Sequence, residues 1–509
     1  MFIRKKTNKS GKISVQIISK ASGKYKVVKT VGCSDNLEEI EKLFLQAHYL
    51  IPEITGQTTL ALETELDKQI DNFVDTLAST QIHVIGPELI LGHLFDSIGF
   101  NIFSNDLFRH LVISRLSYPG SKLKTIDYLQ RYKNIFVSSD KIYRFLDELQ
   151  SKYKERVEKI SFEHSKKILK GKITVVFYDM TTLYFEAADE DDLRKIGFSK
   201  DGKFQNPQIM IGLLVGENGY PIGYDIFKGN TFEGHTLIPV LEQVQKKYDL
   251  EKPIVVADAG LLSKDNLEKL AKKKYKYIIG ARLKNETSEI KENILKEAKN
   301  IENGDSFTLK KSDKTRLIIT YSDKRARKDE YNREKGLRKL RIRVGTGKLT
   351  KQSINNRGYN KFLTLEGDVK VQVDEDKIKE DEKWDGLKGY HTNTRFSPKR
   401  IVKKYTHLWQ IEKAFRISKT DLKVRPIYHR LKNRIEAHIC IAFTAYTIYK
   451  ELERILSNHK IGFSAKRAIE LTQNIYEISY TLPDSKKQKT KYLKMDDEQL
   501  ILFNIIKNS

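Results

Sequence analysis

The stretch VVFYDMTTLYF, Val175 to Phe185, is an apolar run that carries a single carboxylate, Asp179. Val, Phe, Tyr and Leu at this density favour a strand inside a sheet. An ionised carboxylate in such a strand costs several kcal/mol unless a positive charge meets it. The stretch therefore predicts a buried strand whose acidic group needs a cationic partner.

The residues that follow predict an α/β sheet. Apolar runs alternate with segments of helical periodicity, and an Asn218-Gly219 turn joins two of the strands. Helices that cross over between strands imply that at least part of the sheet is parallel. The predicted order is strand, two strands, helix, strand, helix, strand, at 172–179, 207–227, 235–250, 252–260, 262–274 and 276–283.

Two of the apolar strands end in aspartate, Asp179 and Asp258. Ligands of open α/β sheets collect at the carboxyl ends of the strands, so adjacent strands would bring both carboxylates to one crevice. Hard cations such as Mg²⁺ prefer carboxylate oxygens, and one here would supply the missing positive charge. Because two carboxylates do not close a two-metal site by themselves, we expect a third.

The best candidate for the third carboxylate is Glu412, in YTHLWQIEKAFRISK, Tyr405 to Lys419. Helix positions seven apart return to within ~20° of one direction, which places Tyr405, Glu412 and Lys419 on one stripe. The segment from Lys399 to Arg434 holds twelve Lys and Arg against two acids. Such a basic surrounding suits phosphate binding beside a metal.

Each of these residues also has a purely structural interpretation. Glu412 with Arg416 is an i, i+4 pair of the kind that stabilises helix surfaces. An aspartate at the end of a strand can cap the turn or helix that follows. The three carboxylates taken together, with their strand-end and helix placement, favour the functional interpretation.

The composition favours a polyanionic partner. The chain has 93 Lys and Arg against 67 Asp and Glu, a formal net charge of +26, and nucleic acid is the first candidate. Cys33 and Cys440 stand apart from any metal-ligand spacing, so neither a disulfide framework nor a zinc site is indicated. The longest apolar stretch, 438–449, is too short to span a bilayer. We expect a soluble, cytoplasmic protein.

These motifs resemble the DDE transposases of bacterial insertion sequences, in the cut-and-paste group with a Tyr-Arg-Glu-Lys signature. Tyr405, Glu412 and Lys419 match that signature in register, whereas Leu408 stands at the arginine position. We expect Arg416, one turn beyond Glu412, to substitute for that arginine. The resemblance covers residues 172 to 449 and includes the blocks YDMTT, QIMIGLLV, PIGYDIFKGN, VVADAGL and KWDGLKGYHTNT.

The resemblance implies an α/β fold with a ribonuclease H-like catalytic core, a β-rich insertion, and helical N-terminal and C-terminal regions. The predicted divisions are a β-hairpin region at 1–58, a helical and DNA-binding region at 59–165, the first part of the core at 166–284, the insertion at 285–397, the second part of the core with the catalytic helix at 398–455, and a helical region at 456–509.

The resemblance also implies the chemistry. Asp179, Asp258 and Glu412 would be catalytic and would hold two Mg²⁺ ions, for which Mn²⁺ substitutes, with Asp179 shared by both. The partners would be double-stranded DNA, as terminal inverted repeats and as target, and a second copy of the chain in a homodimer on DNA. The protein would be nucleoid-associated and would bind no membrane. The expected DNA contacts are Tyr405, Lys419, Arg416, Lys423, Arg425, Trp384 and Trp409, the two tryptophans by stacking on a displaced base.

Three other functions remain open. A nuclease on the same core would hydrolyse DNA without strand transfer, and a transposase-derived protein could bind DNA without catalysis. A haloacid-dehalogenase-like phosphotransferase shares a strand followed by Asp-x-x-Thr, but Thr181 stands where that family has its second aspartate.

Overall fold

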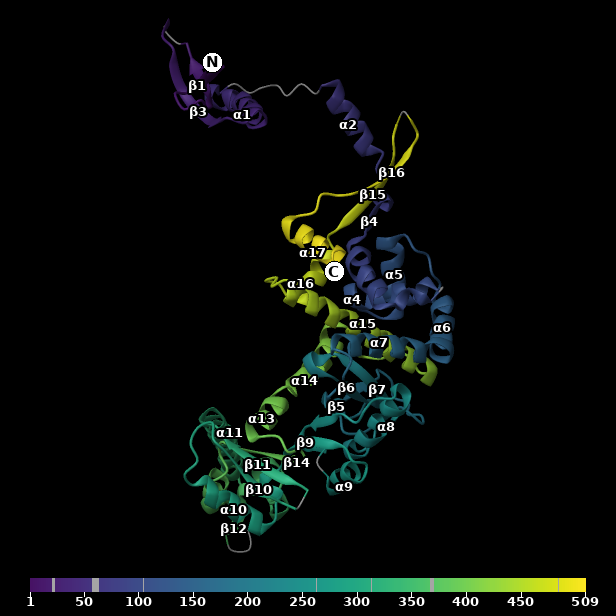
Figure 1. Ribbon diagram of the computed structural model, residues 1–509, viewed down its shortest axis with the longest axis vertical. Coiled ribbons are helices and arrows are strands. Elements are labelled where there is room, and N and C mark those ends of the chain that lie inside the picture. Colours follow the sequence, from purple (N-terminus) through teal and green to yellow (C-terminus); the bar gives the residue numbers. More distant parts are fainter. Residues whose placement is uncertain are drawn as a thin grey trace. The chain divides into compact units, whose positions relative to one another are not determined.

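The computed structural model describes residues 1–20, 23–56, 64–103, 105–261, 263–312, 314–366, 370–483 and 485–509. The chain divides into two compact units (Figure 1). The first comprises Met1–Ser79 with Pro483–Lys486, and the second comprises Thr80–Leu482 with Lys487–Ser509. All candidate site residues belong to the second unit.

The first unit is a small sheet with a helix packed on it. Strands β1 (Phe2–Thr7), β2 (Ile13–Ser19) and β3 (Lys26–Ser34) pair antiparallel in that order. Helix α1 (Leu37–Thr55) buries Ile40 and Ala47 against Val15 and Ile17 of β2. Helix α2 (Glu65–Asp75) follows. The predicted hairpin region is therefore a three-stranded sheet, and α1 within 1–58 was not predicted.

The second unit is built on one mixed sheet in the order β10-β11-β14-β9-β8-β5-β6-β7. Strands β5, β8 and β9 are parallel, and every other pairing in this sheet is antiparallel. The sequence-predicted order of elements, the parallel pairing and the α/β fold class are all confirmed. Its elements are β5 (Val175–Tyr184), β6 (Gln208–Val215), β7 (Pro221–Lys228), α8 (Leu237–Tyr248), β8 (Ile254–Ala257), α9 (Lys264–Lys272) and β9 (Lys276–Ala281).

Both faces of this sheet are covered, which explains why its strands are apolar throughout. Val175 and Phe177 of β5 lie in one core cluster with Ile411, from a helix far along the chain. Val176 and Tyr178 lie in a second cluster on the opposite face, together with residues of α8. Side chains alternate along a strand, so Asp179 belongs to the face of Val175 and Phe177.

The insertion, 285–397, extends the sheet and adds helices. Strands β10 (Ser306–Lys310), β11 (Arg316–Tyr321) and β14 (Leu387–Thr392) join the main sheet beside β9, and β12 (Leu363–Glu366) pairs with β13 (Lys370–Val373). The predicted β-rich character is only part of the structure of this segment, because it also holds α10 (Ser288–Ala298), α11 (Asp323–Gly345) and α12 (Glu375–Glu382). Lys, Arg and Glu are good helix formers, which accounts for helices in a segment so rich in charge.

Along the chain, helices precede and follow the strands of this sheet (Figure 1). The preceding ones are η3 (Glu88–Gly92), α3 (His93–Ile98), α4 (Asp106–Ser117), α5 (Lys122–Lys133), α6 (Ser139–Glu148), η5 (Leu149–Tyr153) and α7 (Lys154–Ile168). The following ones are α13 (Pro398–Thr406), α14 (Trp409–Arg416), the π-helical turn η12 (Ile417–Asp421) and the long buried α15 (Lys432–Asn458). Among the described residues, no helix is long and apolar enough to cross a membrane.

The C-terminal region was predicted to be helical, but it contains strands as well as helices. Helices α16 (Ala465–Thr472) and α17 (Asp497–Lys507) enclose strands β15 (Tyr476–Thr481) and β16 (Gln488–Tyr492). Strand β15 also pairs with β4 (Ile82–Val84), which lies almost four hundred residues earlier. A strand that depends on so distant a partner leaves little local signal in the sequence.

Candidate active site

Asp179 and Asp258 occupy neighbouring positions on two parallel strands. Tyr178 of β5 pairs with Ala257 of β8, so the two aspartates are the next residues in register. Asp258 follows the last residue of β8, as predicted. Asp179 does not end its strand, because β6 pairs with β5 as far as Tyr184. The strand-end prediction is thus wrong for Asp179, whereas the predicted adjacency of the strands is confirmed.

Lys200 is the positive group that meets Asp179. Its Nζ lies 3.6 Å from Asp179 Oδ1, and it also donates to the carbonyl oxygen of Met180 at 2.6 Å. The pKa of Asp179 is raised to about 6, chiefly by burial; Lys200 and the backbone N–H of Met180 oppose this rise, and the charges of Asp258 and Glu233 add to it. The carboxylate is therefore only partly compensated, and the site retains affinity for more positive charge.

Glu233 is an acidic residue of the site that sequence reasoning missed. It opens the short turn η7 (Glu233–His235), and its Oε1 lies 2.8 Å from Lys200 Nζ. A β-carbon placed on Gly260 would lie 3.0 Å from Asp258 Oδ1 and 3.4 Å from Glu233 Oε2. Both carboxylates therefore face the same glycine. Glu233 lies only three residues beyond the motif PIGYDIFKGN, and that proximity was the available signal.

The acidic groups have the ligand chemistry that a hard cation requires, but not its close spacing. Asp258 Oδ1 accepts from the backbone N–H of Gly260 at 2.8 Å, which leaves its second oxygen free of that contact. Asp179, Glu233 and Asp258 offer the carboxylate oxygens that Mg²⁺ prefers. Their side chains are not drawn together, since no three His, Cys, Asp or Glu groups in the described ranges are close enough to hold a metal. Lys200 stands between two of them.

Tyr405 links Glu412 to the aspartates. Helix α13 packs against β8 and β9, and the Tyr405 hydroxyl lies so close to Gly280 of β9 that a β-carbon there would collide with it. Burial raises the pKa of this phenol, and the charges of Asp258 and Glu412 raise it further. Asp258 and Glu412 therefore both lie within electrostatic range of one side chain.

Glu412 is exposed in the first turn of α14, and among the described residues it has no hydrogen-bond or ion-pair partner. Helix α14 packs against β5 through Ile411 and Ala414, on the face to which Asp179 belongs. The i, i+4 pair with Arg416 that a structural interpretation would require is not formed. Glu412 is thus a solvated carboxylate beside the strand that carries Asp179.

The predicted helical stripe through Tyr405, Glu412 and Lys419 is interrupted. Helix α13 ends at Thr406, and the turn at 407–408 separates it from α14. Lys419 lies in η12, where its Nζ is 3.2 Å from both carboxylate oxygens of Asp201. Arg425 Nη1 also contacts Asp201, at 2.7 Å. Lys419 and Arg425 are therefore held together by a shared carboxylate.

The remaining predicted residues fall into different surroundings. Leu408, at the signature's arginine position, is buried in the core. Arg416 and Lys423 are exposed. Trp409 is 52% exposed, and Lys413 Nζ lies 5.9 Å from the centroid of its ring. Trp384 lies far from these residues along the chain, in the insertion.

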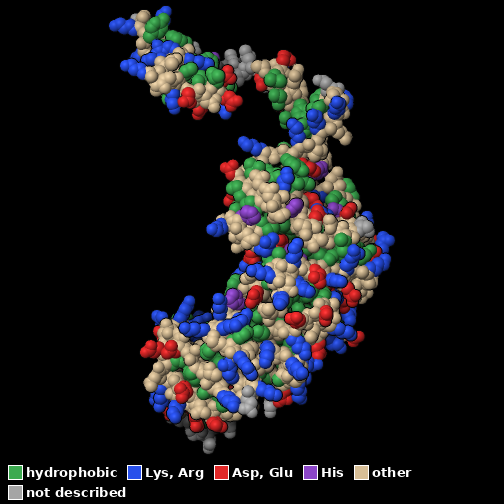
Figure 2. Space-filling view, viewed as in Figure 1, with side chains coloured by type: hydrophobic (Ala, Val, Ile, Leu, Met, Phe, Trp, Pro, Cys, Tyr) green, Lys and Arg blue, Asp and Glu red, His purple; other side chains and the backbone are tan. Residues whose placement is uncertain are grey.

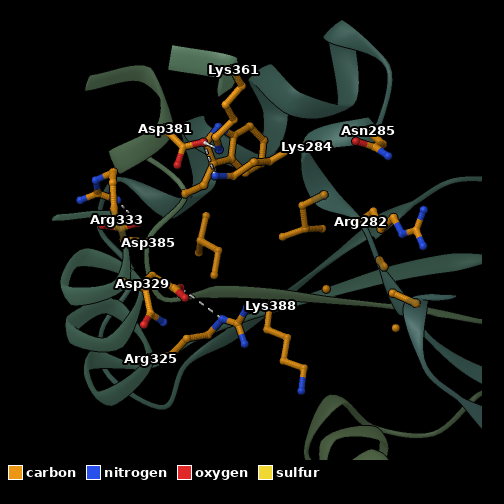
Figure 3. Close-up of a pocket in the computed structure, with 18 of the residues that line it drawn as sticks. Arg282, Lys284, Asn285, Arg325, Asp329, Arg333, Lys361, Asp381, Asp385 and Lys388 are labelled. Atoms are coloured by element: carbon orange, nitrogen blue, oxygen red, sulfur yellow. Dashed lines mark hydrogen bonds and ion pairs between the residues drawn. The ribbon is translucent and has the colours of Figure 1, made fainter. Parts of the chain in front are cut away.

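Trp384 lines a cavity of about 700 Å³ beside the acidic site (Figure 3). Ala259, which follows Asp258, and Tyr405 also line it. The cavity is rich in cations, and the residues labelled in Figure 3 converge on it from the segment after β9 that includes η9 (Leu283–Asn285), and from α11, η11 (Gly358–Phe362), α12 with Asp385 beyond it, and β14. Its lining includes Arg282, Lys284, Arg325, Arg333, Lys361 and Lys388, together with Asp329, Asp381 and Asp385.

Several of these cations are neutralised within the cavity. Lys284 and Lys361 each place Nζ 2.6 Å from Asp381 Oδ1. Lys388 is not paired in this way: its Nζ lies 4.6 Å from the Tyr405 ring centroid, and burial lowers its pKa while Glu412 opposes that effect. Figure 2 shows further Lys and Arg side chains spread over the part of the second unit that holds the sheet and the insertion.

Comparison with known families decides what this arrangement belongs to. The sequence model of the family described as "Transposase DDE domain" matches residues 170–448, more than half of the chain and the whole span from β5 to the middle of α15. This chain belongs to the DDE transposase domain family. Comparison with curated proteins finds no match.

Solved structures of transposases show weak likeness to this family member. A piggyBac transposase synaptic complex with hairpin DNA has 12% identity and a TM-score of 0.38, with 76% of each chain covered. A Mos1 transposase paired-end complex with the left transposon end has 11% identity and a TM-score of 0.16, covering 46% of this chain and 71% of that one. A Mos1 mariner paired-end complex with Mn has 12% identity and a TM-score of 0.15, covering 46% and 72%. Structural similarity at these TM-scores does not indicate the function of this chain.

Proposed function

We propose that this protein is a metal-dependent transposase that cleaves DNA strands at the ends of an insertion sequence and transfers them to a target. One observation carries the proposal: Asp179 and Asp258 are neighbours in register on two parallel strands, and α14 with Glu412 packs against the first of them. The family match over residues 170–448 supports it.

In this proposal Asp179, Asp258 and Glu412 hold two Mg²⁺ or Mn²⁺ ions, with Asp179 shared. When bound, such ions activate a water or a DNA 3′-hydroxyl and stabilise the leaving oxygen of an in-line displacement. Glu233 is a further ligand candidate, because it shares Lys200 with Asp179. Lys200 itself balances the acidic charge in the metal-free protein.

The protein's own side chains would position double-stranded DNA, both terminal repeats and target, and a homodimer would pair the two ends. Tyr405 and Lys388 lie where the cationic cavity meets the acidic site, so they are suited to a phosphate near the cleaved bond. Trp384 lines the same cavity, which has the volume for a displaced base to stack. Arg416, Lys423 and Trp409 are exposed for backbone contacts, and Asp201 orients Lys419 and Arg425.

The proposal is tested with DNA that carries the element's own end sequence. Asp179→Asn, Asp258→Asn and Glu412→Gln should each reduce Mg²⁺-dependent cleavage to the level of a reaction without enzyme, while binding in a mobility-shift assay persists. Asp189→Asn, which alters an exposed carboxylate, is the matched control and should cleave normally. If Glu412→Gln retained cleavage and Glu233→Gln lost it, Glu233 rather than Glu412 would be assigned as the third metal ligand. Cleavage retained by Asp179→Asn would refute the site.

Strand transfer separates a transposase from a nuclease on the same core. Incubation of pre-cleaved ends with a supercoiled target should yield joined products that depend on the three carboxylates. Hydrolysis without any joined product would favour the nuclease.

A further inference from the structure

A second pocket of the same unit collects several positively charged side chains, and among the described residues that line it only Arg425 pairs with a carboxylate. It has a volume of about 520 Å³ and lies between the end of α4, the start of α5 and the loop after η12. Of the described residues, those that line it include no Asp or Glu. Its cationic and ionisable lining comprises Arg115, Lys122, Lys124, Lys423, Arg425, His429 and His438.

Two of these cations are almost fully buried. Arg115 is 4% exposed and Lys122 is 6% exposed. Arg115 Nη1 donates to the carbonyl oxygens of Leu422 and Lys423 at 3.4 and 3.3 Å, but its Nε has no partner. Lys122 has no hydrogen-bond or ion-pair partner anywhere in the described ranges. Burial and the nearby charge of Arg115 lower the pKa of Lys122 well below its ordinary value, because a buried ammonium without a partner is unfavourable. A bound anion would stabilise its protonated form.

The remaining groups of the pocket also favour an anion. Burial lowers the pKa of both His429 and His438, and the charges of Lys122 and Arg115 lower them further. Both rings are therefore neutral near pH 7, and they can offer hydrogen bonds rather than positive charge. His438 Nε2 lies 3.0 Å from the carbonyl oxygen of Val424, and its Nδ1 has no partner. Lys122 begins helix α5, whose first N–H groups and dipole attract negative charge. The carboxylate of Asp147, whose charge acts on His429, already pairs with Arg434, and Asp201 pairs with Lys419 and Arg425.

The ligand class follows from charge and position. Several convergent cations beside a helix N-terminus are the usual environment of a phosphate group. Exposed Tyr428 and Leu123 form part of the rim and offer apolar contact to the groups attached to a phosphate. Arg425 belongs to this pocket and also shares Asp201 with Lys419, so the pocket is continuous with the basic segment that follows Glu412.

We propose that this pocket binds a phosphate group of a DNA strand, with Arg115 and Lys122 as its buried anchors. The proposal rests on the proposed function for the identity of the ligand as DNA. It adds a contact outside the acidic site, made by α4, α5 and the loop 423–429.

The first test measures whether the pocket takes phosphate at all. Inorganic phosphate should raise the melting temperature of the wild-type protein more than sodium chloride at equal ionic strength, because a ligand that binds only the folded state stabilises it. Lys122→Met should lose this difference, and without phosphate it should melt higher than wild type, since it replaces a buried polar group that lacks a partner by an apolar one. Lys159→Gln, at an exposed lysine of α7, should behave as wild type.

If Lys122→Met does not fold, Lys124→Ser serves instead, because Lys124 is exposed and lines the same pocket. It should weaken the phosphate effect without raising the melting temperature. Equal stabilisation by phosphate in wild type and in the pocket variants would overturn the proposal.

The second test identifies DNA as the source of the phosphate. Binding of a duplex oligonucleotide is measured against salt concentration in the Asp179→Asn background, so that no cleavage step enters. Adding Lys122→Met should weaken binding and reduce the slope of log K against log salt by ~1, the loss of one phosphate contact. Adding Lys159→Gln should leave the slope unchanged.

A phosphate-dependent rise in melting temperature with an unchanged salt slope would assign the pocket to a free phosphate compound and overturn the proposal for DNA. Neither test depends on cleavage. A negative result for the pocket therefore does not change the interpretation of the cleavage experiment, and a negative result for cleavage does not change the interpretation of the pocket tests.

Discussion

Asp179 is a residue whose charge the metal-free fold accommodates poorly. Its side chain is 22% exposed, and burial together with Asp258 and Glu233 raises its pKa from 3.8 to about 6 in spite of Lys200. A raised pKa means that the folded state holds the proton more tightly than the unfolded state. The resulting penalty is absent well below pH 3.8, grows as the pH rises from 3.8 to about 6, and is complete above about 6.

Asp179→Asn should therefore stabilise the metal-free protein. In the presence of EDTA at about pH 7.5, its free energy of unfolding should exceed that of wild type by on the order of 2 kcal/mol, and the gain should shrink to a small fraction of that value by about pH 4. Urea unfolding at both pH values measures this, with Asp189→Asn as an exposed control that should change neither value. A destabilised Asp179→Asn at pH 7.5 would show that the carboxylate serves stability rather than metal binding.

At the scale of elements, the sequence predicted what local pattern encodes. Strand β5 is apolar on both faces because helices cover both, and that burial is legible in Val175 to Phe185. Asp258 could be placed at its strand end because β8 stops there. The extension of β5 beyond Asp179 could not be placed, since it depends on the length of β6, and Glu233 was missed because only folding brings it to Lys200.

The junction of the core with the insertion shows the same dependence on tertiary contacts. Glu286 lies between β9 and α10, with its side chain 8% exposed, and its carboxylate meets His391 Nε2 of β14 at 2.8 Å and Lys311 Nζ at 2.6 Å. Burial alone would raise the pKa of Glu286, but these two partners lower it from 4.5 to about 2. This carboxylate fastens the start of the insertion to the strands that extend the sheet.

Glu286→Gln should destabilise the protein by on the order of 2 kcal/mol near neutral pH. Because the folded-state pKa is depressed, the stabilisation from Glu286 is complete above about 4.5 and is lost as the pH falls toward 2. The difference between wild type and variant in urea unfolding should therefore shrink between about pH 5 and pH 3. Glu292→Gln, at an exposed position of α10, should show no difference at any pH. A constant difference across this range would mean that Glu286 acts through packing alone.

At the scale of the whole molecule, positive charge is unevenly distributed within the first unit. Residues 1–34, which form β1, β2 and β3, hold nine Lys and Arg and no Asp or Glu. Residues 35–79 hold ten Asp and Glu against two lysines. The unit is therefore nearly neutral overall, yet its sheet is basic and its helical segment is acidic. Its own small core, built from Val15, Ile17, Ile40 and Ala47, fixes this polarity.

A basic sheet of this kind should bind DNA through its backbone, independently of the acidic site, because counterion release depends on local contacts rather than on net charge. In full-length protein, Lys26→Ser with Lys29→Ser on β3 should reduce the slope of log K against log salt by ~1–2 on any duplex sequence. Lys42→Ser on α1 is the matched control, an exposed lysine among acids, and should leave the slope unchanged. Melting temperatures should stay at the wild-type value in both variants, since these side chains are exposed. An unaltered slope in the β3 variant would limit the DNA contacts of this transposase-family protein to its second unit.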